Sequence, residues 1–367
     1  MKPSILCILH LPPPIHGAAV IGQYLHDSKS FNDTFDCHFI NLTTADSLQD
    51  IGKGSFRKLW TYAKLLFNIA KSTKRYRPKL VYITPNTKGI GFYKDFIVIQ
   101  LVKLSRRKII VHFHNKGVEE RQGKAFDNFL YKRFFNGIKV ILLAKSLFQD
   151  IKKYVPMEDV YICPNGIASP LDEVNISQHH TNTPKLLFLS NLLIAKGVFT
   201  LLDALKKLKD CNCHFTCNLI GGETTEINSK KINQEILSRG LNHNVFYKGS
   251  KYGKDKEEEF AAANIFVFPT HSDCFPLVLL EAMQHKLPCI STIEGGIPNI
   301  IDDGKTGFVV LKKDPDVLAN KIKYLLDHPE ERRIMGENGY KKYEQQFTLS
   351  HFENNIIRCL TKELFNN

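Results

Sequence analysis

Short apolar runs alternate with segments of helical pattern along the whole chain, and this alternation constrains the fold more than any other feature of the sequence. Residues 5–11 and 265–269 are two of the apolar runs, and residues 277–284 are helix formers. Strands that alternate with helices form parallel sheets with helices on both faces. Because 367 residues with 43% hydrophobic content can bury two cores, the sequence predicts an α/β protein of two domains.

The stretch HSDCFPLVLLEAMQH, residues 271–285, places the carboxylates of Asp273 and Glu281 eight positions apart around Pro276. It follows an apolar run, so the local prediction is strand, short loop and helix, with Pro276 in the first turn, where its missing N–H is not needed. Such a junction directs backbone N–H groups and the positive end of the helix dipole into the loop, where a diphosphate can bind without a metal. Carboxylates placed there can accept bonds from sugar hydroxyls, which predicts a sugar-nucleotide site.

This stretch resembles the Glu-x7-Glu element, commonly written EGFPLVLLEAM, of retaining glycosyltransferases with the GT-B fold, the family 4 class (glycosyl transferases group 1). The chain has Asp273 where the family usually has Glu, and Cys274 where it usually has Gly. The aspartate keeps the charge and shortens the reach by one methylene.

A second segment, residues 186–205 (LLFLSNLLIAKGVFTLLDAL), is similar to the family's GRLxxxKG segment. Lys196 and Gly197 match, and Asn191 stands where the family usually has Arg, so Lys196 is the main side-chain cation expected on the diphosphate. Four further segments follow the family's order: LIGG (219–222), NVFYKGS (244–250), AAANIFVFP (261–269) and EGGIPNIIDDGKTGFVV (294–310).

The N-terminal half carries weaker matches. Gly17 follows a strand-like run, at the place of the family's glycine-containing loop, and His114 falls where the family has a histidine near the anomeric centre. Histidines at i and i+2 of a strand point the same way, so His112 and His114 could instead belong to a metal site or be structural.

The resemblance implies two Rossmann-like domains facing each other across a cleft, with the C-terminal helix crossing back to the N-terminal domain. The predicted parts are an acceptor-binding domain (1–167), a polar linker (168–185), a nucleotide-sugar-binding domain (186–345) and the returning helix (346–367).

The resemblance also implies roles for individual residues. Lys196 and the backbone near Phe275, Pro276 and Leu277 would bind the diphosphate, Glu281 the ribose and Asp273 the donor sugar, with His114 facing the reacting carbon. Donor contacts are further expected from the following residues: Gly17, Asn191, Gly295 and Gly296. No metal and no cofactor are expected.

The expected reaction moves a hexosyl unit from a UDP-sugar, or second a GDP-sugar, to a saccharide or lipid-linked saccharide in surface polysaccharide biosynthesis. An alternative is a catalytically weak nucleotide-sugar-binding or regulatory module, which Asp273 and Asn191 favour. The presence of Glu281, Lys196 and His114 favours the enzyme.

Positive charge is concentrated in the N-terminal half. Residues 1–170 hold 26 lysines and arginines against 12 aspartates and glutamates, a net charge of +14. Residues 171–367 hold 24 against 25, a net charge of −1, so the whole excess of +13 lies in the N-terminal half. Residues 55–78 predict a basic amphipathic helix, with an apolar stripe and bases elsewhere: Leu59, Trp60, Ala63, Leu66, Phe67 and Ala70 against Lys58, Lys71, Lys74, Arg75 and Arg77. The charge predicts contact with an anionic membrane surface; a core helix with a solvated basic face is the alternative.

No nucleic-acid-binding motif accompanies the basic residues, so nucleic acid is not an expected partner. Nine scattered cysteines do not form a disulfide framework, and reduced, mostly buried thiols are expected. The first apolar run is too short for a signal peptide, and no run approaches the roughly 20 residues of a membrane span. The expected location is the cytoplasm, peripheral at the cytoplasmic face of the membrane.

Overall fold

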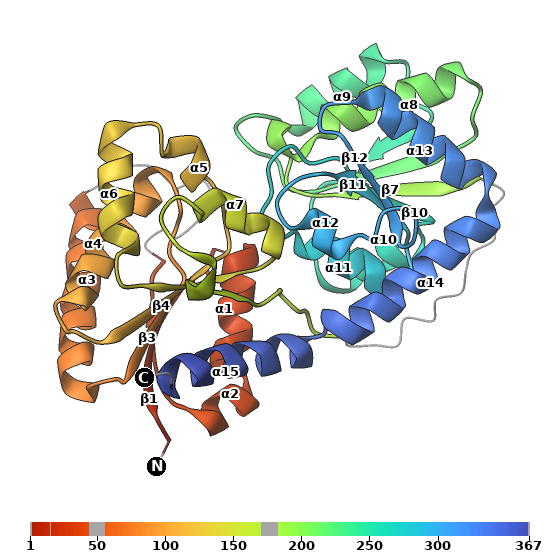
Figure 1. Cartoon of the computed structure of the whole chain (residues 1–367). Coiled ribbons are helices and arrows are strands. Elements are labelled where there is room, and N and C mark those ends of the chain that lie inside the picture. The colour runs from red at the N-terminus through yellow and green to blue at the C-terminus, as the bar shows by residue number, and fades with distance from the viewer. Residues whose placement is uncertain (1, 15, 44–55, 170–182, 366–367) are drawn as a thin grey trace. The chain divides into compact units, whose positions relative to one another are not determined.

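The computed structural model describes residues 2–14, 16–43, 56–169 and 183–365. The chain divides into two compact units, one of Met1–Gly166 with Leu349–Asn367, the other of Ile167–Thr348 (Figure 1). Most of the predicted linker, residues 170–182, lies outside the described residues.

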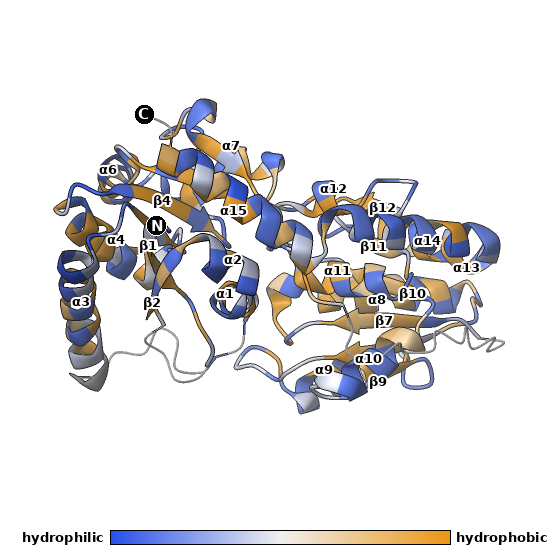
Figure 2. Ribbon diagram, turned by 90° about the horizontal axis from the view of Figure 1, so that it is seen from below, coloured by the Kyte–Doolittle hydropathy of each residue, from blue (hydrophilic) through white to orange (hydrophobic). Residues whose placement is uncertain are grey.

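The first unit is a parallel six-stranded sheet in the order β2-β1-β3-β4-β5-β6. The strands are β1 (Ser4–Leu9), β2 (Asp36–Asn41), β3 (Leu80–Ile83), β4 (Lys108–Phe113), β5 (Lys139–Leu142) and β6 (Val160–Ile162). The helices between them are α1 (Gly17–Asp27), α2 (Lys29–Thr34), α3 (Phe56–Tyr76), α4 (Gly89–Lys103), α5 (Val118–Arg121), α6 (Ala125–Phe135) and α7 (Phe148–Ile151). The central strands are buried on both faces, which explains their continuous apolar runs (Figure 2).

The second unit is also a parallel six-stranded sheet, in the order β12-β11-β10-β7-β8-β9. Its strands are β7 (Lys185–Leu189), β8 (Thr216–Ile220), β9 (Val245–Tyr247), β10 (Ile265–Phe268), β11 (Cys289–Thr292) and β12 (Gly307–Val310). Its helices are α8 (Val198–Asp210), α9 (Ser229–Ser238), α10 (Gly253–Ala261), α11 (Leu277–Gln284), α12 (Ile297–Ile300), α13 (Pro315–Asp327) and α14 (Pro329–Gln346). In chain order this is the Rossmann arrangement 3-2-1-4-5-6. The predicted α/β class with two Rossmann-like sheets is confirmed.

The last helix, α15 (Leu349–Phe365), belongs to the first unit. Its apolar residues Phe352, Ile356 and Leu360 are buried, and the Glu363 carboxylate accepts a hydrogen bond of 3.1 Å from the Tyr161 hydroxyl. The expected return of the C-terminal helix to the N-terminal domain is confirmed.

Helix α3 forms where the sequence predicts it, but the predicted apolar stripe is not the face that packs on the protein, as the alternative of a core helix required. The packed face carries Leu65, Ile69 and Thr73, which are buried. Trp60 and Phe67 of the predicted stripe are 65% and 67% exposed. The packed face is the one that meets α4, where the Tyr62 hydroxyl donates to the Lys94 carbonyl oxygen at 2.6 Å. Helical periodicity defines the two faces, and the neighbouring helix decides which one is covered.

None of the nine cysteines, all of which lie in the described residues, forms a disulfide, and six of them are buried. No helix within the described residues is long and apolar enough to cross a membrane.

Candidate functional site

The chain order of the second sheet reverses between β7 and β10, which are hydrogen-bonded neighbours. In open parallel sheets, ligands bind beyond the carboxyl ends of the strands at such a reversal. The loop after β7 carries Asn191 and Lys196, and the loop after β10 carries Asp273. The topology therefore brings two of the predicted sequence motifs to one edge of one sheet.

Lys196 and Asp273 form an ion pair. The Lys196 ammonium lies 2.6 Å from an Asp273 carboxylate oxygen, and the two side chains are 23% and 15% exposed. The next residue, Gly197, has a φ of +79° and packs so closely that an added Cβ would lie 1.9 Å from the Pro269 carbonyl oxygen. Only glycine allows this approach of the two loops, and the approach places the cation and the carboxylate together.

Helix α11 begins directly beyond Asp273. Pro276 occupies its N-cap and not the first turn, where the sequence placed it. Its carbonyl oxygen accepts from the Leu279 N–H at 3.2 Å, so only the N–H groups of the first two helical residues lack an acceptor within the helix. The Phe275 ring is buried against Phe347, with ring centroids 6.0 Å apart. Because that side chain packs into the protein, only the backbone at Phe275 is available to a ligand.

Gly295 and Gly296 approach the same loop. Gly295 has a φ of +53°, and an added Cβ would lie 2.4 Å from the Asp273 carbonyl oxygen. The Gly296 N–H donates to the Cys274 carbonyl oxygen at 2.6 Å. The sequence predicts a close approach of these glycines to a ligand; in the structure they approach the backbone that carries Asp273.

Asn191 lies beside the glycines that end β8. Its neighbour Leu192 donates its N–H to the Gly222 carbonyl oxygen at 2.8 Å, and a Cβ added at Gly222 would lie 3.0 Å from the Asn191 side-chain oxygen. Asn191 is exposed at the same edge of the sheet as Lys196.

Glu281 lies one turn inside α11, as predicted, and has a partner that the sequence analysis missed. The Lys256 ammonium of α10 donates to its carboxylate at 3.1 Å, and the side chains are 22% and 24% exposed. Lys256 also lies 3.9 Å from Glu257, whose carboxylate is 2.8 Å from the His285 ring. No motif marks Lys256, and only the placement of α10 beside α11 identifies it.

The carboxyl edge of the first sheet gathers histidines. Gly17 is the first residue of α1, and the preceding His16 caps the helix by accepting from the Ala19 N–H at 3.3 Å. The closer approach is at Gly22, where an added Cβ would lie 2.1 Å from the His10 carbonyl oxygen. Gly22 is therefore the glycine that lets α1 pack against the end of β1, and it was not singled out from the sequence.

His114 follows the last residue of β4, with its ring 4.3 Å from that of His112. His112 is buried and bonded through Nδ1 to the Tyr82 hydroxyl at 2.8 Å, as a structural histidine would be. Both ring nitrogens of His114 are shielded from solvent, and neither has a hydrogen-bond partner within the described residues. The described parts of the chain contain no group of three or more His, Cys, Asp or Glu side chains fit to hold a metal ion.

Burial, and second the neighbouring histidines His10 and His16, lower the pKa of His114 to about 3. Burial, then His16 and Lys94, lower the pKa of His10 to about 4. Both rings are therefore neutral at pH 7, where each can accept a hydrogen bond but carries no positive charge.

These pKa values predict acid sensitivity of the fold. An unfolded histidine binds a proton near pH 6.5, whereas folded His114 and His10 do so only near 3 and 4. The free energy of unfolding should therefore be highest above pH 6.5 and fall as pH drops from 6.5 toward 4, by at most about 1.4 kcal/mol per pH unit for each ring. Urea unfolding between pH 4.5 and 7.5 measures this, and His114→Phe should reduce the slope. A free energy that is constant between pH 7 and 5 would contradict it.

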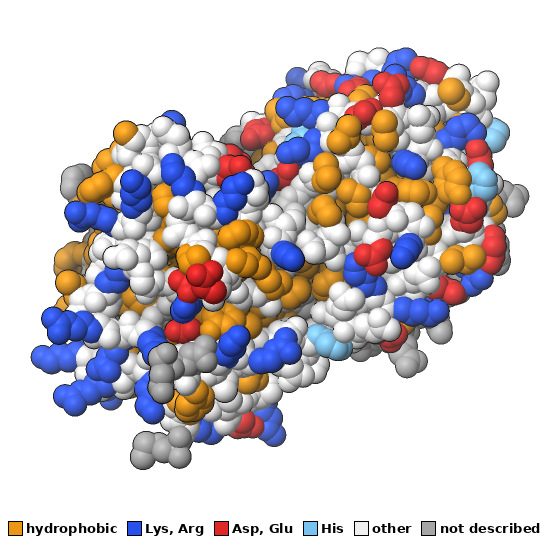
Figure 3. Space-filling model, viewed as in Figure 1, with side chains coloured by type: hydrophobic (Ala, Val, Ile, Leu, Met, Phe, Trp, Pro, Cys, Tyr) orange, Lys and Arg blue, Asp and Glu red, His pale blue; other side chains and the backbone are white. Residues whose placement is uncertain are grey.

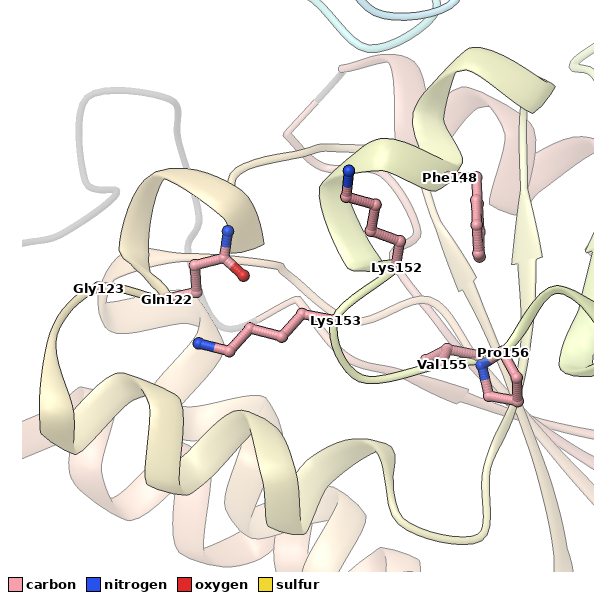
Figure 4. Close-up of a pocket in the computed structure, with 7 residues that line it drawn as sticks. All are labelled: Gln122, Gly123, Phe148, Lys152, Lys153, Val155 and Pro156. Carbon is pink, nitrogen blue, oxygen red and sulfur yellow. The ribbon is translucent and has the colours of Figure 1, made fainter.

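The first unit also has a surface cavity of about 600 Å³ between the segments that follow α5 and α7 (Figure 4). Gln122 and the two lysines Lys152 and Lys153 line it together with apolar groups, among them Phe148 and Pro156. It offers cationic and apolar contacts in the unit where the acceptor is expected.

Known proteins match the chain over both units. Residues 172–342 match the family described as "Glycosyl transferases group 1". The chain is 26% identical over 322 residues to O-antigen chain mannosyltransferase C of Escherichia coli, covering 82% of each protein. Among solved structures it is similar to sucrose-phosphate synthase from Thermosynechococcus elongatus, with a TM-score of 0.77 and 17% identity over 100% of this chain and 99% of the other.

A second solved structure, Anabaena Alr3699/HepE in complex with UDP, has a TM-score of 0.75 and 18% identity, covering 99% of this chain and 100% of the other. These structures share the fold over the whole chain, and the family match covers almost all of the second unit. The second unit thus matches the glycosyl transferases group 1 family over residues 172–342, and the two Rossmann-like sheets have the GT-B fold that these structures share.

Proposed function

We propose that the chain is a retaining, metal-independent hexosyltransferase that uses a nucleotide-diphosphate sugar as donor. The observation that carries this proposal is the Lys196–Asp273 pair at the reversal of a Rossmann sheet, directly before the N-terminus of α11. A cation and free backbone N–H groups at such a place suit a diphosphate, and an adjacent carboxylate suits the hydroxyls of a sugar.

In the proposed reaction, the bond between the anomeric carbon and the leaving phosphate oxygen breaks. The acceptor hydroxyl oxygen bonds to that carbon from the same face, and its proton passes to the leaving diphosphate. Lys196 and the α11 N-terminus would stabilise the negative charge that develops on the diphosphate, which we take as the largest catalytic contribution. Neutral His114 would accept a hydrogen bond from a sugar hydroxyl, and Glu281 would bind the ribose.

For the donor we propose a UDP-sugar first and a GDP-sugar second. The complex of HepE with UDP supports the first choice, and the likeness to an O-antigen chain mannosyltransferase supports a hexosyl group. That likeness also supports a saccharide or lipid-linked saccharide acceptor in surface polysaccharide biosynthesis. The net charge of +14 in residues 1–170 supports a location at the anionic cytoplasmic face of a membrane.

A regulatory module that binds the donor without efficient transfer is the second candidate. Two observations favour it: Asn191 stands where the family usually has a cation, and Asp273 already neutralises Lys196. A diphosphate must then compete with Asp273 for the ammonium group.

A thermal-shift series with UDP-, GDP-, dTDP- and ADP-sugars tests the proposal. The matching donor, at 100 times its dissociation constant, should stabilise the fold by about 2.7 kcal/mol. We expect the largest shift from a UDP-sugar, and transfer or slow hydrolysis of the same donor without added metal. Binding without any turnover, even with a range of acceptors, would favour the regulatory module, and no shift with any donor would contradict both candidates.

A further inference from the structure

The first unit exposes large apolar side chains on three of its helices. α3 packs beside α4 and α4 beside α6, and the three helices lie together in both ribbon views (Figures 1 and 2). These side chains are each at least 48% exposed to solvent: Leu59, Trp60, Phe67, Ile90, Ile97, Leu104, Phe126 and Phe129. Large apolar side chains exposed on neighbouring helices indicate a candidate interaction site.

On α3, rings and lysines share one stripe. Trp60, Lys64, Phe67, Lys71 and Lys74 follow the spacing of three and four residues that places side chains on one face of a helix. All five are exposed, and the Lys64 ammonium lies 5.4 Å from the centre of the Trp60 ring. At 100° per residue, this stripe points away from the packed residues of α3, and no described residue of its unit covers it.

The surroundings of the stripe are basic. Residues 51–150 hold 22 lysines and arginines against 5 aspartates and glutamates. Figure 3 shows Lys and Arg side chains gathered at the lower left of the view, where α3 lies in Figure 1. On α6 the Arg133 guanidinium lies 4.6 Å from the centre of the exposed Phe129 ring.

The positive charge indicates which kind of partner binds the stripe on α3. A second copy of the chain would bring an equally basic face, and like charges oppose that contact. An anionic lipid bilayer satisfies both halves of the pattern: rings can enter the boundary between headgroups and acyl chains, while lysines extend along it to place their ammonium groups among the phosphates.

We propose that the outward stripe of α3 inserts into an anionic membrane interface, with Trp60 and Phe67 at the depth of the first acyl carbons and Lys64, Lys71 and Lys74 at the headgroups. The stripe on α3 is the anchor. This deepens the membrane location proposed above, on which it rests, and is independent of the donor chemistry.

Trp60 is the only tryptophan of the chain and so reports directly on this contact. We expect its fluorescence emission to move to shorter wavelength when the full-length protein meets vesicles of phosphatidylglycerol and phosphatidylcholine, and bromine on the acyl chains to quench it. Vesicles of phosphatidylcholine alone should produce neither change. Cosedimentation with anionic vesicles without a shift or quenching would overturn insertion, and so would equal shifts with both kinds of vesicle or no binding at all.

Variants separate the contribution of the rings to vesicle binding from that of the lysines. Trp60→Ala with Phe67→Ala should lower vesicle affinity by roughly ten-fold or more, and the change of Lys64, Lys71 and Lys74 to Gln by roughly a hundred-fold. The matched control is Leu237→Ala with Phe246→Ala on the second unit, at side chains that are 64% and 42% exposed, and it should bind as the parent does.

Transfer from the nucleotide sugar to a water-soluble acceptor should be unchanged in the Trp60 and Phe67 variant. If this variant lost both that transfer and vesicle binding, α3 would act on the site and not on a membrane. If the parent protein binds vesicles but transfers no sugar, the proposed reaction fails and the membrane contact stands.

Discussion

Lys196→Ala should lower turnover by about a hundred-fold or more, because it removes the one side-chain cation that the β7–α8 loop of the second unit brings to the predicted diphosphate position. The loss should appear in kcat as well as in kcat/KM, since the charge on the leaving diphosphate grows toward the transition state. Steady-state transfer assays with the matching donor measure it. Unchanged kinetics would show that the backbone of α11 alone holds the diphosphate.

The ion pair with Asp273 requires controls. Removing Lys196 leaves a carboxylate that is only 15% exposed without its partner, which should also lower stability by roughly 1–3 kcal/mol. The double variant with Asp273→Ala should recover stability but not turnover, which separates folding from catalysis. Lys206→Ala, at an exposed lysine paired with Asp210 in α8, is the matched control and should change neither stability nor turnover. Asn191→Arg should preserve or tighten diphosphate binding.

Glu281→Ala should weaken binding of the donor nucleotide by roughly ten- to a hundred-fold, which corresponds to the 1.5–3 kcal/mol of a charge-assisted hydrogen bond. Asp273→Ala should instead lower turnover more than nucleotide affinity, because we place it against the transferred sugar. Titration calorimetry with the free nucleoside diphosphate and kinetics with the intact donor distinguish the two. Full activity in both variants would place the site elsewhere.

The Lys256 contact extends this prediction. If Lys256 only holds the Glu281 carboxylate in position, Lys256→Ala should reduce nucleotide affinity less than ten-fold, and Lys256→Arg should restore most of it. A loss as large as that of Glu281→Ala would mean that the lysine contacts the nucleotide itself.

Much of the local structure can be predicted from the sequence because it depends on neighbours along the chain. The strand, loop and helix around Asp273 form where the apolar run, Pro276 and the helix formers predict them. The glycine after Lys196 signals a tight turn, and the structure has a left-handed residue there. Parallel sheets covered by helices follow from the alternation of such segments, and their Rossmann-like arrangement was implied by the family resemblance.

Contacts between distant segments could not be predicted in this way. Lys196 and Asp273 are 77 positions apart, and their ion pair depends on β7 and β10 being neighbours in the sheet. Lys256 and Glu281 are 25 positions apart and meet because α10 lies beside α11. A resemblance assigned roles to three of these four residues, but it assigned none of these partners.

The sequence by itself determined the fold class, the positions of the main loops, the concentration of positive charge and the extent of α3. Only the tertiary structure decided which face of α3 is covered, which carboxylate meets which lysine, and that Phe275 packs inward. The physical reason is that hydrogen-bonding patterns and helical periodicity are local, whereas burial and ion pairing depend on the order of strands in a sheet and on the helices packed against it.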